Sequence, residues 1–315
     1  MVRSGSVLFS VALLCMGQVA AQDFPTRPIR VISSVPGSSG DNVIRMIAPR
    51  ISGPLGQQVI IDNRPSATTA ETLVKSPPDG YTLLIDATSL WIGPLLQEMP
   101  YDPVRDLTPI STSDRSPSCL TVNPSLPVKT VKDLIALAKA RPGQLDYGSS
   151  ATGTLSHLGA ELFRSIAGIN IVRVPYKGGA LAVQGVISGE VSIVFNSIGS
   201  VKQLINTGRL KALGIASLQP SPLAPGMPTI AEQGVPGFEA ILIQGIFAPA
   251  KTPEPIVRRL NQEIVRALSS DEMKEKFLQH GVEAVPSTPD AFAATVKSEM
   301  AKWGKLIKSA GIRAN

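Results

Sequence analysis

Two short stretches of serine, glycine and threonine have the residue types that bind small anions. The first covers residues 37–41 (Gly-Ser-Ser-Gly-Asp), and the second covers residues 147–157 and ends in a histidine. Each follows a β-rich run and precedes apolar residues at helical spacing, which predicts a strand, a loop and a helix start. The first N–H groups of a helix lack intrahelical partners and attract negative charge. We interpret both stretches as candidate anion-binding loops. The alternative is a tight turn whose serine caps the helix.

Catalysis is the second possibility for these residues. Ser149 or Ser150 could act as a nucleophile with His157 as its base, but no acid that would orient the histidine is evident. The chain has no Gly-x-Ser-x-Gly elbow and no Gly-Lys-Ser/Thr phosphate loop. His157 and Glu161 have the spacing of two metal ligands on one helix, yet no third ligand is evident, so we expect no metal and no cofactor. A secreted hydrolase remains an alternative hypothesis.

The composition indicates a globular protein with room for two domains. The chain has 315 residues, of which 17% are charged and 43% are hydrophobic, and such values do not suit a disordered protein. Lysine and arginine exceed aspartate and glutamate by 30 to 24, and aromatic residues make up 4%. The positive charges are not clustered. Because nucleic-acid grooves combine clustered cations with stacking rings, we expect no nucleic-acid partner.

The first 21 residues have the layout of a secretory signal. Arg3 precedes an apolar segment at residues 7–16, and small residues precede the expected cleavage point after Ala21. The apolar segment is too short to span a bilayer. Cys15 lies inside this segment, so the mature chain would retain Cys119 alone and form no internal disulfide. The sequence therefore predicts export.

The rest of the chain alternates predicted strands and helices, which is the pattern of βαβ units and a parallel sheet. We expect strands at 29–35, 59–62, 81–86, 118–122, 145–149, 171–174, 191–195, 210–216 and 239–247. A proline-punctuated connector at 123–127 predicts one crossing between domains, and the long strand at 239–247 predicts the return. The expected division is a signal at 1–21, lobe 1 at 22–122, lobe 2 at 123–238, and a return to lobe 1 with the C-terminal helices at 239–315.

Several motifs in a shared order carry a family resemblance over nearly the whole mature chain. They include Pro-Gly-Ser-Ser-Gly-Asp at 36–41, Asp-Asn-Arg-Pro at 62–65, Pro-Asp-Gly-Tyr-Thr-Leu-Leu at 78–84, Tyr-Asp-Pro at 101–103 and Val-Pro-Tyr-Lys-Gly-Gly at 174–179. Each motif alone is unspecific, but their order and spacing are specific. The chain resembles the periplasmic solute receptors of tripartite tricarboxylate transporters, often called Bug proteins.

The resemblance implies an α/β fold with two Rossmann-like lobes joined by a two-strand hinge, the type II periplasmic binding protein clamshell. It also implies a periplasmic monomer that holds a small carboxylate or related organic anion between the lobes and delivers it to integral membrane transporter subunits. The implied ligand-binding residues are Gly37, Ser38, Ser39, Gly40, Asp41, Ser66 and Ala67 in lobe 1, and Ser149, Ser150, Thr154, His157 and Asn196 in lobe 2.

The sequence departs from the family pattern around the expected site. Ser38 replaces the second of two adjacent glycines, and Ser-Ala-Thr-Thr at 66–69 replaces a glycine-rich loop. Ala151 stands where glycine is usual, and Ile243 stands where tryptophan is frequent. These changes bear on the ligand more than on the fold. They leave open a degenerate receptor that serves as a sensory module.

Overall fold

The computed structural model describes residues 24–313, so the predicted signal at 1–21 lies outside the described residues. The strands are β1 (Ile29–Ser33), β2 (Val59–Asn63), β3 (Thr82–Ala87), β4 (Leu107–Val122), β5 (Leu145–Ser149), β6 (Ile171–Pro175), β7 (Ile193–Ser197), β8 (Lys211–Ile215), β9 (Ile241–Pro249) and β10 (Glu283–Ala284). The helices are α1 (Ser39–Leu55), α2 (Ser66–Val74), α3 (Ser89–Leu96), α4 (Val131–Ala140), α5 (Leu155–Ala167), α6 (Gly179–Ser188), α7 (Ile198–Asn206), α8 (Glu254–Ser269), α9 (Asp271–Gln279) and α10 (Pro289–Ala310).

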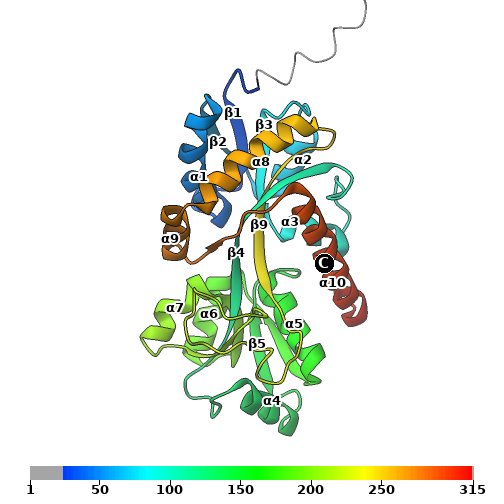
Figure 1. Ribbon diagram of the computed structural model, residues 1–315. Helices are drawn as coiled ribbons and strands as arrows, with labels where there is room; N and C mark the ends of the chain where they lie inside the picture. The colour runs from blue at the N-terminus through cyan, green and yellow to red at the C-terminus, as the bar shows by residue number, and fades with distance from the viewer. Residues whose placement is uncertain (1–23, 314–315) are drawn as a thin grey trace, which may run out of the picture.

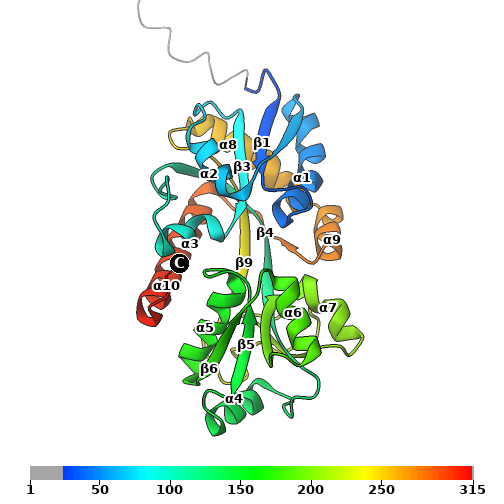
Figure 2. The same ribbon diagram turned by 180° about the vertical axis from the view of Figure 1, so that it is seen from behind.

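The strands form two lobes that share the long strand β4 (Figure 1). In lobe 1 the order is β2, β1, β3, β9 and β4, with β10 on the other edge of β4. In lobe 2, β4 pairs with β7 and β8, and β5 and β6 extend the sheet beyond β7. Seen from behind, β4 and β9 are the two strands that pass from one lobe to the other (Figure 2). The predicted α/β clamshell with a two-strand hinge is confirmed.

Strand β4 is longer than the sequence indicated. We expected a strand at 118–122, but β4 runs for 16 residues from Leu107 to Val122. It pairs with β9 as far as Pro117 and with β7 and β8 from Ser118 onward. Its polar residues are buried on both faces, so the alternation that marks a half-buried strand is missing. We propose the lobe boundary at 117/118, inside the strand rather than after it.

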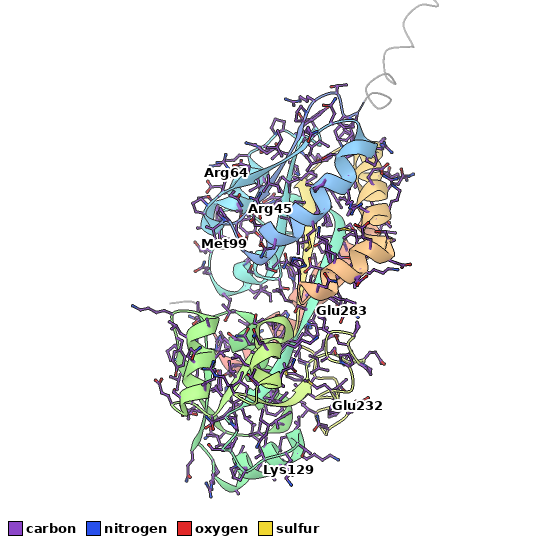
Figure 3. All side chains as sticks on the ribbon, turned by 90° about the vertical axis from the view of Figure 1, so that its left-hand side faces the viewer. Arg45, Arg64, Met99, Lys129, Glu232 and Glu283 are labelled. Atoms are coloured by element: carbon purple, nitrogen blue, oxygen red, sulfur yellow. The ribbon has the colours of Figure 1, made fainter. Side chains whose placement is uncertain are left out.

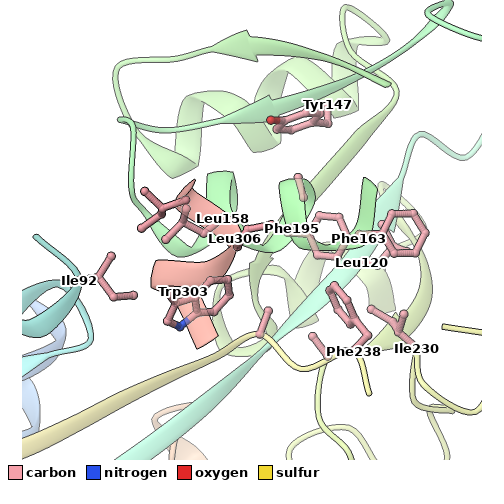
Figure 4. Close-up of a cluster of buried hydrophobic side chains, with 14 of the residues drawn as sticks. Ile92, Leu120, Tyr147, Leu158, Phe163, Phe195, Ile230, Phe238, Trp303 and Leu306 are labelled. Atoms are coloured by element: carbon pink, nitrogen blue, oxygen red, sulfur yellow. The ribbon is translucent and has the colours of Figure 1, made fainter. Parts of the chain in front are cut away.

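Helix α10 joins the hydrophobic cores of the two lobes. In lobe 1 it packs Phe292 against Phe247 of β9, with ring centroids 4.8 Å apart. Further along, Trp303 lies in the same buried cluster as Leu158 and Phe163 of lobe 2. Figure 4 shows Trp303 and Leu306 between Ile92 of lobe 1 and Leu158 of lobe 2. The C-terminal helix therefore packs against both lobes.

Asp114 is a buried carboxyl group in the hinge strand β4. The Ser113 hydroxyl donates to its Oδ1 at 2.7 Å, and its Oδ2 has no hydrogen-bond partner within residues 24–313. Burial raises the pKa of Asp114 to about 7, against about 3.9 in an unfolded chain. At pH values between these two pKa values, Asp114 is protonated in the folded state and ionised in the unfolded state. The free energy of unfolding therefore rises as the pH falls from about 8 toward about 4.

Replacing Asp114 with asparagine is expected to stabilise the protein, and more strongly at pH 8 than at pH 5. Asparagine keeps the acceptor for Ser113 and removes the ionised form, so the gain at pH 8 should exceed the gain at pH 5 by about 2 kcal/mol. Urea unfolding at the two pH values measures this difference. Asp271→Asn, at a fully exposed carboxylate, is the control and should change stability equally at both. Equal effects for Asp114→Asn would show that the buried group is not held neutral.

Candidate ligand-binding site

A cavity of about 390 Å³ lies in lobe 1 beside the carboxyl ends of β1 and β3. In an open α/β sheet this edge is where ligands bind. Five of the predicted ligand-binding residues line it: Ser38, Ser39, Gly40, Ser66 and Ala67. Met99, which also lines the cavity, lies at the edge of lobe 1 nearest lobe 2 (Figure 3). The first predicted loop and the segment at 66–67 thus border one space.

Three helices begin at this cavity. Helices α1, α2 and α3 start at Ser39, Ser66 and Ser89, and each contributes its first two residues to the lining. Within the described part of the chain, no protein acceptor is recorded for the N–H groups of these residues: Ser39, Gly40, Ser66, Ala67, Ser89 and Leu90. The described lining includes no lysine or arginine. The cavity therefore offers main-chain donors and helix dipoles to an anion.

Gly37 and Asp41 shape the first loop and do not line the cavity. The Asp41 carboxylate is buried and accepts hydrogen bonds from the Gly37 N–H at 2.9 Å, Asn63 Nδ2 at 2.8 Å and Arg45 Nε at 2.9 Å. The pKa of Asp41 is lowered to about 2, and the hydrogen bond from Arg45 is the largest cause. Its oxygens are thus occupied by the protein. A contact between either residue and a ligand stays a prediction.

Asp86 and Gln244 are among the polar residues of the cavity that were not predicted from the sequence. Asp86, the half-buried next-to-last residue of β3, accepts the Ala87 N–H at 2.7 Å and faces the Thr69 hydroxyl at 3.3 Å. Gln244 of β9 is 1% exposed and donates through Nε2 to the Ser39 hydroxyl. Asp86 ends a predicted parallel strand, and the ends of such strands lie at the same sheet edge as loop 37–41. Its position in the sequence could therefore have identified it. Gln244 lies some 200 residues further along the chain, and no local pattern places it there.

The second predicted loop is held in lobe 2 by Arg173 of β6. Arg173 donates to the Ser149 hydroxyl at 2.8 Å, to the Ser150 carbonyl at 2.9 Å and to the Thr152 hydroxyl at 3.1 Å. The Ser150 hydroxyl donates to Thr154 Oγ1 at 2.9 Å. These contacts fix the loop, and Arg173 is a cation that the sequence analysis did not associate with it.

His157 and Asn196 also form hydrogen bonds with other residues of lobe 2. His157 Nδ1 accepts the Gly153 N–H at 3.2 Å, which assigns the ring proton of the neutral form to Nε2. Burial, followed by the charge of Arg173, lowers the pKa of His157 to about 4. Asn196, near the end of β7, accepts the Ser197 N–H at 2.9 Å. Among the described residues no hydrogen bond joins His157 to Ser149 or Ser150, so the catalytic pair of the hydrolase hypothesis is not formed.

The lobes touch at two glycines of lobe 2. A Cβ atom at Gly153 would collide with a methyl group of Leu96, which lies at the end of α3 in lobe 1. On the α9 side, a Cβ atom at Gly199 would lie 3.0 Å from the Cα atom of Gly281. The second loop thus contacts lobe 1 at Leu96, although none of its residues lines the cavity.

Two features are absent from the described region: a cluster of metal-ligand side chains and an apolar helix of membrane-spanning length. Residues 24–313 contain no group of three or more His, Cys, Asp or Glu side chains placed to hold a metal ion. Glu161, the neighbour of His157 on α5, accepts from the Tyr147 hydroxyl at 2.5 Å and from Arg164 at 2.6 Å. No helix in this part of the chain is both long and apolar enough to cross a membrane.

Comparison with known proteins identifies the family of this chain. Residues 43–312 match the family model described as the tripartite tricarboxylate transporter family receptor, TctC. The chain is 35% identical to Protein BugT of Bordetella pertussis over 302 residues, which cover 94% of this chain and 93% of BugT.

Two ligand-bound structures are similar to this chain. R. palustris Rpa4515 with adipate has a TM-score of 0.78 and 37% identity, covering 92% of this chain and 99% of that one. MatC from Rhodopseudomonas palustris with bound malate has a TM-score of 0.73 and 27% identity, covering 90% of this chain and 100% of that one. The resemblance seen in the motifs is confirmed, and the chain belongs to the TctC family of periplasmic solute-binding receptors, which includes the Bug proteins.

Proposed function

We propose that this protein is an exported periplasmic receptor that binds a small carboxylate in the lobe 1 cavity and delivers it to a membrane transporter. In this proposal loop 149–157 of lobe 2 closes over the ligand, and Asn196 completes that side of the site. The protein acts as a monomer and releases the ligand unaltered.

The observation that carries the proposal is the set of three helix starts at one cavity. A carboxylate taken out of water loses several kcal/mol unless its oxygens accept hydrogen bonds. Free N–H groups at the starts of α1, α2 and α3 supply donors in a fixed arrangement and need no arginine. The adipate and malate of the two similar structures are both small carboxylates, which supports this ligand class.

Thermal unfolding with a panel of carboxylates tests the proposal. A ligand that binds the folded state alone, present at 100 times its dissociation constant, adds about 2.7 kcal/mol and should raise the midpoint by about 5 °C or more. Native mass spectrometry of freshly purified protein would identify a retained acid. If no organic anion shifts the midpoint at millimolar concentration, the ligand-binding role fails and a sensory module without a ligand becomes the better account.

Turnover of substrate is not expected. The family is one of receptors rather than enzymes, and a histidine with a pKa of about 4 bonded to a backbone N–H is poorly placed to activate a serine. An activated ester should therefore be hydrolysed no faster by the wild-type protein than by His157→Ala. Turnover that disappears in this variant would instead support the hydrolase hypothesis.

A further inference from the structure

The cavity carries acceptor atoms as well as donors. Asp86 lines it, and the Thr69 hydroxyl near Asp86 Oδ2 has one hydrogen to share between that oxygen at 3.3 Å and the Ser66 carbonyl at 3.0 Å. Gln244 Oε1 is buried at the same cavity and has no hydrogen-bond partner within residues 24–313. Asp86 thus presents an incompletely satisfied acceptor to the ligand space, and Gln244 holds a second acceptor covered in the cavity wall.

These acceptors do not suit a ligand made of carboxylates alone. The free N–H groups of the three helices satisfy a carboxylate, but an ionised Asp86 repels one, and no lysine or arginine of the described lining offsets that repulsion. An acceptor taken out of water without a donor is costly, so Asp86 is satisfied best by a ligand group that donates a hydrogen bond. The cavity therefore has two chemically different requirements.

We propose that Asp86 selects ligands that carry a hydrogen-bond donor, an ammonium or a hydroxyl group, beside the carboxylate. The proposal rests on the proposed receptor function and names its substrate class as small amino or hydroxy carboxylates. The carboxylate lies at the helix starts, and the donor group binds Asp86 Oδ2. A plain dicarboxylate of the same length binds more weakly.

Matched ligands that differ in one substituent test this selection. Aspartate, malate and succinate form one set, and 2-aminoadipate, 2-hydroxyadipate and adipate form a longer one. Calorimetry with the wild-type mature chain should show the amino or hydroxy member of at least one set binding about tenfold or more tightly than the plain diacid. The amino and hydroxy arms show which donor the site takes.

Asp86→Asn is the decisive variant because it keeps the size of the side chain and removes its charge. We expect this variant to bind the amino or hydroxy ligand more weakly and the plain diacid more tightly than the wild type does. The preference for the substituted ligand is then lost. Glu98→Gln, at an exposed acid next to Met99 and outside the cavity lining, controls for the general loss of negative charge and should keep the wild-type ratio. A far-ultraviolet circular dichroism melt confirms that each variant is folded.

The pH dependence gives a second readout of the same contact. Burial raises the pKa of Asp86 to about 6, and Tyr101, the ionisable neighbour in the lining, has a pKa raised to about 12 and stays neutral. A plain diacid should bind the wild type roughly tenfold more tightly at pH 6 than at pH 8, because Asp86 must take up a proton. An amino ligand should show the opposite trend, and Asp86→Asn should flatten both.

The outcomes separate this inference from the proposed function. If the plain diacids bind as tightly as their substituted partners, or if Asp86→Asn keeps the wild-type preference, the role of Asp86 is overturned while the receptor function stands. If no member of either set binds, the choice of small amino and hydroxy carboxylates is overturned. The wider carboxylate panel then decides whether the receptor proposal survives.

Discussion

Replacing Ala67 with tryptophan is expected to weaken ligand binding at least 100-fold, about 2.7 kcal/mol, without unfolding the protein. Ala67 is the second residue of α2, its side chain is exposed, and it lines the lobe 1 cavity. An indole there occupies the space that the proposed carboxylate needs beside the helix starts. Calorimetry with a ligand that stabilises the wild type measures the loss, and a thermal melt without ligand checks the fold.

Thr68→Trp is the matched control for this blocking experiment. Thr68 is the next residue of α2 and is equally exposed, but it is outside the cavity lining. The same indole side chain at this position should leave the dissociation constant close to that of the wild type. Should Ala67→Trp bind as the wild type does, the ligand occupies another part of the molecule, and the lobe 1 cavity is not its site.

Replacing Trp303 with alanine is expected to lower the free energy of unfolding by about 3–5 kcal/mol. The Trp303 side chain is fully buried in the cluster that α10 shares with both lobes, and its Nε1 donates to Glu299 Oε2 at 2.8 Å. The substitution leaves a cavity and removes the donor to a buried carboxylate, so both effects act in the same direction. Urea unfolding at pH 7 measures the change.

Two further variants of α10 make this result specific. Trp303→Phe keeps most of the apolar volume and should lose less stability than Trp303→Ala. Lys305→Ala, on the exposed face of the same helix, should change the unfolding free energy by less than about 0.5 kcal/mol. If Trp303→Ala costs no more than Lys305→Ala, helix α10 is not packed between the lobes in solution.

The local parts of the fold were predictable because their signals lie in short stretches of sequence. Ser38 precedes an apolar helical pattern, and it does cap α1 by accepting the Asp41 N–H at 3.3 Å. The strand expected at 81–86, which follows the turn-forming sequence Pro-Pro-Asp-Gly at 77–80, corresponds to β3. Pro253 marked the start of α8, as proline at a helix start usually does. In these places propensity, capping and hydrophobic spacing all favour the same structure.

Features that depend on distant segments were not predictable in this way. Strand β4 carries buried serines and threonines, and its burial follows from pairing on both edges: with β9 and β10 in lobe 1, and with β7 and β8 in lobe 2. Helix α3 begins directly after β3 and contains Pro94, and its apolar run shows no single face. Neither the period-2 nor the period-3.6 pattern identifies such segments.

The residues of the candidate site also fall into a group that was predictable from local sequence and a group that was not. Ser38, Ser39, Gly40, Ser66 and Ala67 line the cavity and are in motifs that the sequence displays. Asp86, Gln244 and the start of α3 complete it from strands and helices that meet through the sheet order. In lobe 2, Arg173 binds loop 149–157 from the neighbouring strand, through the β5–β6 pairing. The participation of the lobe 2 residues in ligand binding stays a prediction.

The close contact between Gly199 and Gly281 also has a consequence for the closure of the two lobes. Both residues lack side chains, so the contact is between main-chain atoms, which cannot rotate aside as a lysine or leucine would. Such a contact resists any closer approach of the two main-chain segments on the α9 side. We expect the closing angle to be set by the protein itself, with short and long ligands held at the same degree of closure and distinguished by how well they fill the remaining space.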